Sequence, residues 1–149
     1  MGRTLGYMIT WTTFGTWLQG DNRRYVKNAR TLPANQKLVE SNRHLQLQDA
    51  VKLTDDQRQI VHRAILEEAR QQGHRIYALV VQSCHVHIVA GYIHKPISKI
   101  VAYYKKAARV ALQMSGHNGR VWTKGYDKRF CFDQETLEQK ISYVNSHNK

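Results

Sequence analysis

The chain has 149 residues, and its 23 lysines and arginines against 11 aspartates and glutamates give a formal net charge of +12 with histidines neutral. A chain of this length is expected to form one domain with its own apolar core, and the charge indicates a polyanionic partner, with nucleic acid ahead of an anionic membrane surface. No apolar run approaches the roughly 20 residues of a membrane span, and two cysteines without Cys-x-x-Cys spacing exclude a disulfide framework, so we expect a cytoplasmic protein without a membrane partner.

The N-terminal part of the chain predicts one strand followed by a long excursion. Residues 6–16 are dense in aromatic and β-branched side chains, which favour a strand. Residues 17–53 show no sustained helical or strand period and carry a basic group that includes Arg23 and Arg24. This basic insertion suits an arm that binds nucleic acid and a solvated charged loop about equally well.

A helix with clear start and stop signals follows. Thr54 and Gln57 have the spacing of a capping box, and apolar side chains recur at helical spacing over residues 55–72. Gly73 is the residue type that most readily ends a helix in the left-handed conformation. A β-branched run at 75–82 then predicts a second strand, which turns almost at once into a third and pairs with it antiparallel.

The third strand is expected within residues 83–90, which read Ser-Cys-His-Val-His-Ile-Val-Ala. Successive side chains of a strand point to opposite faces, so His85 and His87 share a face and Cys84 points away from them. Neutral imidazole nitrogens suit a divalent cation, and a sheet would hold the two rings rigidly. The pair is either part of a metal site or two half-exposed strand histidines, and a third ligand would decide between these readings.

A second helix combines an apolar face with a basic one. It is expected to begin at Pro96 or Ser98 and to run to about Met114. Three basic side chains fall on or beside its outer face and are candidates for contact with DNA phosphates: Lys105, Lys106 and Arg109. A solvated helix face is the ordinary alternative for such a group.

An aromatic segment and a last helix complete the pattern. Residues 120–132 predict a strand or an extended segment with a turn near Gly125, and Asp133 is a good N-cap for the helix that follows. The resulting order is strand, helix, strand, strand, helix, strand, helix. This is the order of an α+β ferredoxin-like sandwich, in which helices pack on an antiparallel sheet.

The last helix supplies side chains that could complete a site. Tyr143 and His147 are four residues apart and therefore share a helix face. If that face covers His85 and His87, three imidazoles and one phenol meet at one place. Three protein ligands with open coordination positions are typical of a catalytic metal, and a divalent cation polarises a phosphate for attack by a tyrosine. These are the parts of a phosphodiester transesterase.

Taken together, these motifs resemble a known family. His-Val-His on a strand, a basic helix, an aromatic segment and then Tyr-Val-Asn-Ser-His-Asn resemble the single-tyrosine HUH transposases of the insertion-sequence-200-like superfamily, in particular the REP-associated tyrosine transposases. Residues 8–15, the helix around 98–106 and the pair Val121-Trp122 are also similar to that family. The resemblance covers most of the chain outside 17–53 and implies one domain of HUH endonuclease type over residues 1–149.

The resemblance implies a metal-dependent nickase and strand transferase that acts on single-stranded DNA. In such enzymes the tyrosine attacks a DNA strand, keeps the 5′ phosphate as a phosphotyrosine and frees a 3′ hydroxyl, with Mg²⁺ or Mn²⁺ as the metal. Carried onto this sequence, Tyr143 is the nucleophile, His85 and His87 are the HUH ligands, and His147 takes the place of the third ligand. Single-stranded or hairpin DNA is the implied partner, at the nucleoid, and the protein acts as a monomer or a homodimer.

Two departures from the family's pattern bear on these roles. The family usually has an amide side chain at the third-ligand position, and a histidine there shifts the preference toward Mn²⁺, Co²⁺, Ni²⁺ or Zn²⁺. Relatives also commonly continue with Asn-Pro and further residues, whereas this sequence ends at Lys149. If a tail is missing, recognition of a DNA hairpin or formation of a dimer would be impaired while the site remained.

Other functions and another nucleophile stay open at this point. A domesticated nucleic-acid binding module would keep the fold and the charge without cutting DNA. A replication-initiator-type HUH nickase or relaxase is disfavoured by the short chain, which has no helicase or second domain. Among the tyrosines, Tyr104 falls on the apolar stripe of its helix and is expected in the core, whereas Tyr103 lies near the lysines and could stack on a base.

Overall fold

A computed structural model describes residues 3–15 and 50–147 of the chain. Most of the expected basic insertion, with Arg23 and Arg24, lies outside the described residues. The order of elements in the described part is the one that the sequence predicts. The elements are β1 (Gly6–Thr12), α3 (Asp55–Gln72), β2 (Ile76–Val81), β3 (His85–Gly91), α4 (Ile97–Met114), β4 (Asp127–Cys131) and α5 (Gln134–Asn145).

The four strands form one sheet in the order β2-β3-β1-β4, and every neighbouring pair is antiparallel. With α3 and α4 as the two crossover helices, this is the ferredoxin-like α+β arrangement that the sequence predicts. In the β1–β3 pair Gly6 lies opposite Gly91 and Thr12 lies opposite His85. This register sets β1 directly beside the two histidines of β3.

Two strands are shorter than the sequence predicts, because the chain turns at glycines. β1 ends at Thr12 rather than at residue 16, since Gly15 has a positive φ of 83°. Residues 120–132, expected to form a strand or an extended segment with a turn near Gly125, form a strand only at β4, because Gly125 has a φ of 95° and turns the chain before the strand begins. The expected turn near Gly125 is therefore confirmed.

The helices α3 and α5 begin where their capping residues place them. The Thr54 hydroxyl accepts the Gln57 backbone N–H at 3.2 Å, and the Gln57 side chain accepts the Thr54 N–H at 2.9 Å, which confirms the capping box of α3. Gly73, with φ 66°, ends that helix in the left-handed conformation. In α5 the Asp133 carboxylate accepts the Thr136 N–H at 2.7 Å and forms the predicted N-cap.

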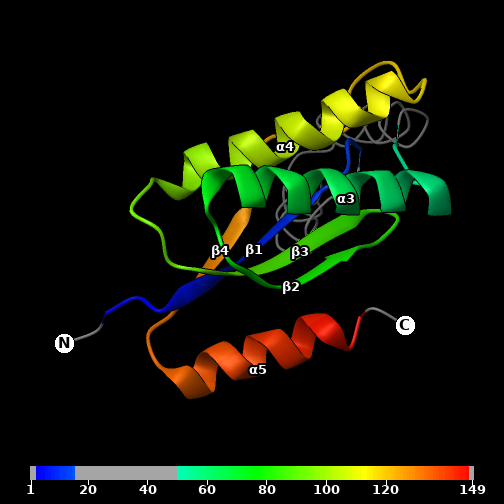
Figure 1. Ribbon diagram of the computed structural model, residues 1–149. Helices are drawn as coiled ribbons and strands as arrows, with labels where there is room; N and C mark the ends of the chain where they lie inside the picture. The colour runs from blue at the N-terminus through cyan, green and yellow to red at the C-terminus, as the bar shows by residue number, and fades with distance from the viewer. Residues whose placement is uncertain (1–2, 16–49, 148–149) are drawn as a thin grey trace, which may run out of the picture.

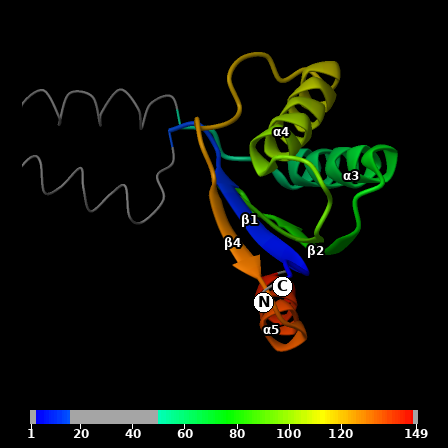
Figure 2. The same ribbon diagram turned by 90° about the vertical axis from the view of Figure 1, so that its left-hand side faces the viewer.

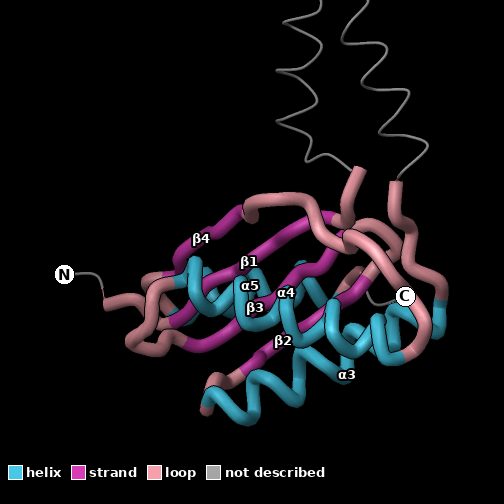
Figure 3. The backbone as a smooth tube through the Cα atoms, turned by 90° about the horizontal axis from the view of Figure 1, so that it is seen from above, coloured by secondary structure: helices cyan, strands magenta, loops and turns pink. Residues whose placement is uncertain are grey.

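The helices lie in two unequal layers on the sheet. Figure 1 shows α3 and α4 together on one face and α5 alone on the other, and Figure 2 shows the same layers from the side. Figure 3 looks down on α3 and α4, with the strands running beneath them. Among the described residues, no helix is long and apolar enough to cross a membrane.

Each face of the sheet has its own apolar core. The larger core lies between the sheet and the α3/α4 layer and includes Trp11, Ile65 and Leu112. The smaller core lies between the sheet and α5 and is formed by Met8, Ala78, Val80, Val89, Cys131, Leu137 and Val144. Since strand side chains alternate, β1 contributes to both cores. The face that carries the smaller core is also the face that carries His85 and His87.

Candidate functional site

The two strand histidines stand together on the face that α5 covers. Their rings are nearly parallel, with centroids 5.9 Å apart and an interplanar angle of 13°. His87 is 9% exposed, whereas His85 at the start of β3 is less buried. The alternation of a strand is sufficient to place both imidazoles on one face.

The last helix brings Tyr143 and His147 to these histidines. The ring centroid of His147 lies 5.5 Å from that of His87 and 4.5 Å from that of Tyr143. Tyr143 meets the His87 ring edge-on at 6.2 Å. The structure therefore gathers the predicted residues into one place, which we call the histidine–tyrosine cluster (His85, His87, Tyr143 and His147).

The phenol of the cluster is open to solvent. Tyr143 is 49% exposed, whereas the helix is anchored by Leu137 and Val144, both of which are buried against the sheet. The same helix turn thus carries a buried anchor and an exposed reactive group. A phosphate could approach the Tyr143 oxygen without disturbing the core.

Hydrogen bonds hold two of the three imidazoles. Nδ1 of His87 is 3.0 Å from the hydroxyl oxygen of Thr10 on β1. Nδ1 of His147 is 2.7 Å from the backbone carbonyl oxygen of Tyr143, one helical turn earlier. A carbonyl can only accept, so Nδ1 of His147 carries the hydrogen and Nε2 is a bare nitrogen in the neutral ring.

Burial keeps the strand histidines neutral. Burial, together with the smaller effect of the neighbouring charges of His85 and His147, lowers the pKa of His87 to about 4. Burial, followed by the charge of His147, also lowers the pKa of His85. At neutral pH both rings are therefore uncharged, which is the state that a metal ligand requires.

The donor set fits a divalent ion of the first transition row. Three imidazoles suit such ions better than Mg²⁺, and ligating histidines commonly have the second ring nitrogen engaged, as in His87 and His147. Within residues 3–15 and 50–147, no three His, Cys, Asp or Glu side chains form a group close enough to hold a metal ion.

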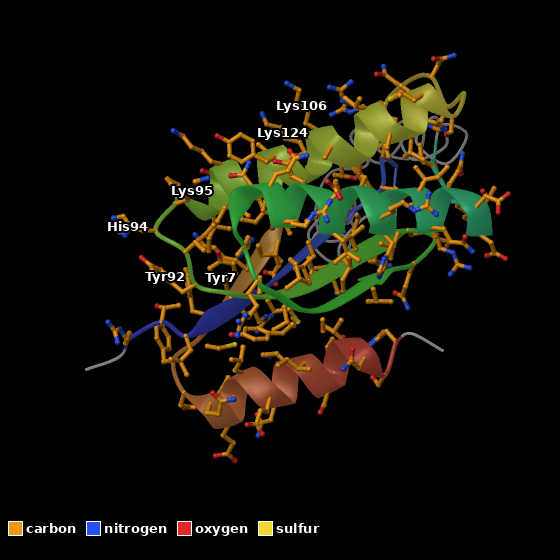
Figure 4. All side chains as sticks on the ribbon, in the orientation of Figure 1. Tyr7, Tyr92, His94, Lys95, Lys106 and Lys124 are labelled. Carbon is orange, nitrogen blue, oxygen red and sulfur yellow. The ribbon has the colours of Figure 1, made fainter. Side chains whose placement is uncertain are left out.

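The predicted DNA-binding residues on α4 differ from one another. Lys106 is exposed and projects from the helix, as Figure 4 shows, and Arg109 is half-buried. The Lys105 amino group instead donates to the carbonyl oxygens of Thr123 at 2.9 Å and Gly125 at 2.7 Å. Lys105 therefore pins the 123–125 turn to α4, and burial lowers its pKa.

The rival tyrosines occupy the positions that the sequence predicts. Tyr104 is buried and its hydroxyl lies 2.5 Å from Nδ1 of His74 in the larger core. Tyr103 is exposed, and the Lys95 amino group lies 5.8 Å from its ring centroid. Both tyrosines are on α4, on the other side of the sheet from the histidine–tyrosine cluster.

Sequence reasoning missed Thr10 and one feature of the charge distribution. Thr10 is polar and buried on the α5 face of β1, and a polar residue inside an aromatic strand is the signal that could have singled it out. Between Glu68 and Asp127 the sequence contains no acidic residue. This stretch includes all of β2, β3 and α4, so its basic side chains lack acidic neighbours in the sequence.

Comparisons with known proteins support the fold. No protein-family model and no curated protein matches the chain. The solved structure of a REP-associated tyrosine transposase bound to a REP hairpin superposes with a TM-score of 0.59 at 13% identity, over 99% of this chain and 68% of that one. A crystal structure of a "putative transposase" from Deinococcus radiodurans superposes with a TM-score of 0.51 at 17% identity, over 98% of this chain and 92% of that one.

The chain thus has the fold of the REP-associated tyrosine transposases, as its motifs predict. At these identities the likeness concerns the backbone, so the chemistry has to be argued from this chain's own residues.

Proposed function

We propose that this protein is a tyrosine transposase that cleaves and rejoins single-stranded or hairpin DNA with Tyr143 as the nucleophile. The observation that carries the proposal is the histidine–tyrosine cluster, in which α5 sets an exposed phenol against the imidazoles of β3. The REP hairpin bound to a protein of the same fold supports DNA as the partner. The net charge of +12 is in keeping with a polyanion.

In the proposed reaction Tyr143 is the nucleophile. Its phenol oxygen attacks the phosphorus of a DNA phosphodiester and loses its proton, while the bond from phosphorus to the 3′ oxygen breaks. The leaving oxygen gains a proton and becomes a 3′ hydroxyl, and the 5′ phosphate stays on the tyrosine. Attack of a 3′ hydroxyl on this phosphotyrosine reverses the steps and rejoins a strand.

His85, His87 and His147 would hold the divalent ion. When bound, Mg²⁺ or Mn²⁺ polarises the phosphate and stabilises charge on the leaving oxygen. An all-imidazole set favours Mn²⁺ over Mg²⁺, because Mg²⁺ prefers oxygen ligands. The neutral state of His85 and His87 at neutral pH supports this role.

The DNA outside the cleaved bond would be held by basic side chains. Lys106 and Arg109 of α4 supply positive charge on a helix without a single acidic residue. The Lys105 amino group is already paired with two carbonyl oxygens, so we assign Lys105 to holding the 123–125 turn in place. Arg23 and Arg24 lie outside the described residues and remain candidates from the sequence.

A covalent adduct tests the proposal directly. The protein is incubated with a pool of hairpin-bearing single-stranded oligonucleotides in Mn²⁺ or in EDTA, and protein–DNA adducts are separated on a denaturing gel. We expect an adduct in Mn²⁺ that mass spectrometry maps to Tyr143 and that Tyr143→Phe abolishes. Tyr103→Phe is the matched control, because Tyr103 is also an exposed helix tyrosine, and it should leave the adduct intact. Adducts that persist in Tyr143→Phe would overturn the assignment.

A binding module that does not cleave DNA is the second candidate. The observation that favours it is that no group of three His, Cys, Asp or Glu side chains among the described residues could hold a metal ion. In that case the same DNAs would bind in EDTA and to Tyr143→Phe equally well, with an affinity that falls steeply with salt. No adduct would form under any condition.

A further inference from the structure

Thr10 and His87 form a buried pair across two strands. They are directly opposite each other in the β1–β3 register, and both are at least nine-tenths buried. The hydroxyl oxygen of Thr10 lies 3.0 Å from Nδ1 of His87. This is the one hydrogen bond that the described part of the chain makes to the His87 ring.

The pair allows two arrangements of one hydrogen. A neutral imidazole carries a single N–H, on Nδ1 or on Nε2. In the first arrangement His87 Nδ1–H donates to Thr10 and Nε2 is bare. In the second the Thr10 hydroxyl donates to Nδ1 and the hydrogen sits on Nε2. Within the described residues His87 Nε2 has no hydrogen-bond partner and is not fully buried, so the first arrangement leaves an accessible bare nitrogen there.

The neighbouring ring already has the first arrangement. His147 donates from Nδ1 to the Tyr143 carbonyl at 2.7 Å, which leaves its Nε2 bare. The His87 and His147 rings are 5.5 Å apart between centroids. Two neighbouring histidines that both carry the hydrogen on Nδ1 present the same kind of nitrogen to a shared ligand.

We propose that Thr10 is a positioning residue that accepts Nδ1–H of His87 and thereby fixes Nε2 of His87 as the metal-binding nitrogen. The role of His87 Nε2 in binding a metal rests on the proposed function, whereas the assignment of the hydrogen to Nδ1 does not. The hydroxyl also fixes the ring plane, because the hydrogen bond runs from a rigid strand to a rigid strand. Thr10 touches neither the phosphate nor the metal.

Nuclear magnetic resonance of the metal-free protein tests the hydrogen position. In long-range ¹H–¹⁵N correlation spectra at pH 7.5, we expect His87 Nε2 to have the chemical shift of a bare nitrogen and Nδ1 that of a protonated one. Thr10→Val keeps the shape of the side chain but removes the acceptor, so both tautomers should become populated. Thr10→Ser should restore the original spectrum. Thr4→Val makes the same chemical change before β1 begins and should leave the His87 spectrum unchanged.

Titration with Mn²⁺ gives a second readout that does not depend on DNA. Loss of a hydrogen bond behind a metal-binding histidine typically weakens metal affinity about 10- to 100-fold. We expect a loss of this size in Thr10→Val, followed by electron paramagnetic resonance, and little change in Thr10→Ser or Thr4→Val. Backbone amide spectra of β1 and β3 check that Thr10→Val folds normally.

The outcomes separate this inference from the proposed function. A hydrogen on Nε2 of His87 in the parent protein, or a Thr10→Val protein with unchanged tautomer and Mn²⁺ affinity, would overturn the role of Thr10 even if DNA adducts form. The expected tautomer and its loss in Thr10→Val would support the role of Thr10 even if Tyr143 never reacts with DNA.

Discussion

The buried histidines on the two faces of the sheet differ in how many of their ring nitrogens are hydrogen-bonded. On the α3/α4 face, His74 donates from Nε2 to the Gly91 carbonyl at 2.9 Å, and its Nδ1 lies 2.5 Å from the Tyr104 hydroxyl. On the α5 face, His87 has one hydrogen bond and the His85 side chain has none within the described residues. A histidine with both nitrogens paired is part of the scaffold, whereas one with a bare nitrogen is available for chemistry.

The helical layers that cover the two faces also differ. Two long helices cover His74 and bury the larger core, whereas the single helix α5 covers the cluster and buries a smaller one. The last turn of α5 carries the exposed Tyr143. The hydrogen-bonded group around His74 therefore lies on the face that two helices cover, whereas the exposed Tyr143 phenol lies on the face that one helix covers.

The largest expected effect is on the α5 face. His85→Ala removes an imidazole that makes no hydrogen bond within the described residues, so the folded state should lose no more than about 1 kcal/mol. The rate of adduct formation should fall on the order of 10²-fold or more, because loss of a metal ligand removes several kcal/mol of charge stabilisation. Single-turnover gels and thermal melts measure the two quantities. His94→Ala, at an exposed histidine, is the control, and an undiminished rate in His85→Ala would place the metal elsewhere.

On the α3/α4 face we expect a loss of folding stability without a loss of the adduct rate. His74→Leu leaves the hydroxyl of Tyr104 and the carbonyl of Gly91 buried without a partner, which should cost about 2–4 kcal/mol in urea unfolding. Tyr7→Phe leaves both hydrogen bonds of His74 to Tyr104 and Gly91 in place. It removes the 3.2 Å contact of the Tyr7 hydroxyl to His74 Nε2 and its contact to the Ile93 backbone, and should cost about 1 kcal/mol. The adduct rate per folded molecule should be unchanged in both variants. A large loss of rate in folded His74→Leu would mean that the two faces are coupled.

Local signals explain which elements could be predicted from the sequence. The start and end of α3 follow from Thr54, Gln57 and Gly73, which lie within or beside the helix. The inward stripe of α4 likewise follows from its own periodicity, and Tyr104 lies in the core as predicted. The ends of β1 and β4 are predicted less precisely, because Gly15 and Gly125, which turn the chain, lie inside runs whose aromatic and β-branched composition favours a strand throughout.

The candidate site likewise has some features that local patterns predict and others that they do not. The shared face of His85 and His87 follows from alternation, and that of Tyr143 and His147 follows from helical spacing. The contact of Thr10 with His87 depends on the register between two strands that are far apart in the sequence. Similarly, the carbonyl partners of Lys105 come from a turn whose path no local pattern predicts, so its role in the scaffold could be seen only in three dimensions.

The smallest expected effect is the dependence of stability on pH, to which His74 contributes. Burial lowers the pKa of His74 below the value of about 6.5 that it has in the unfolded chain. Between these two pKa values the unfolded state binds a proton that the folded state does not, so stability is present above pH 6.5 and is lost as pH falls toward the folded pKa. The slope from one such group is at most about 1.4 kcal/mol per pH unit.

Urea unfolding at pH 7.0 and pH 5.5 measures this dependence. The parent protein should lose stability over the interval, and His74→Leu should lose less, because the residue that resists protonation is gone. His87 and His85 also have lowered pKa values, so part of the slope should remain in the variant. Mn²⁺ would hold these two histidines unprotonated and reduce their share of the slope, whereas the share of His74 should not respond to Mn²⁺. An equal slope in the parent and in His74→Leu would mean that His74 is not kept neutral by the fold, and the contrast between the two faces would then rest on hydrogen bonding alone.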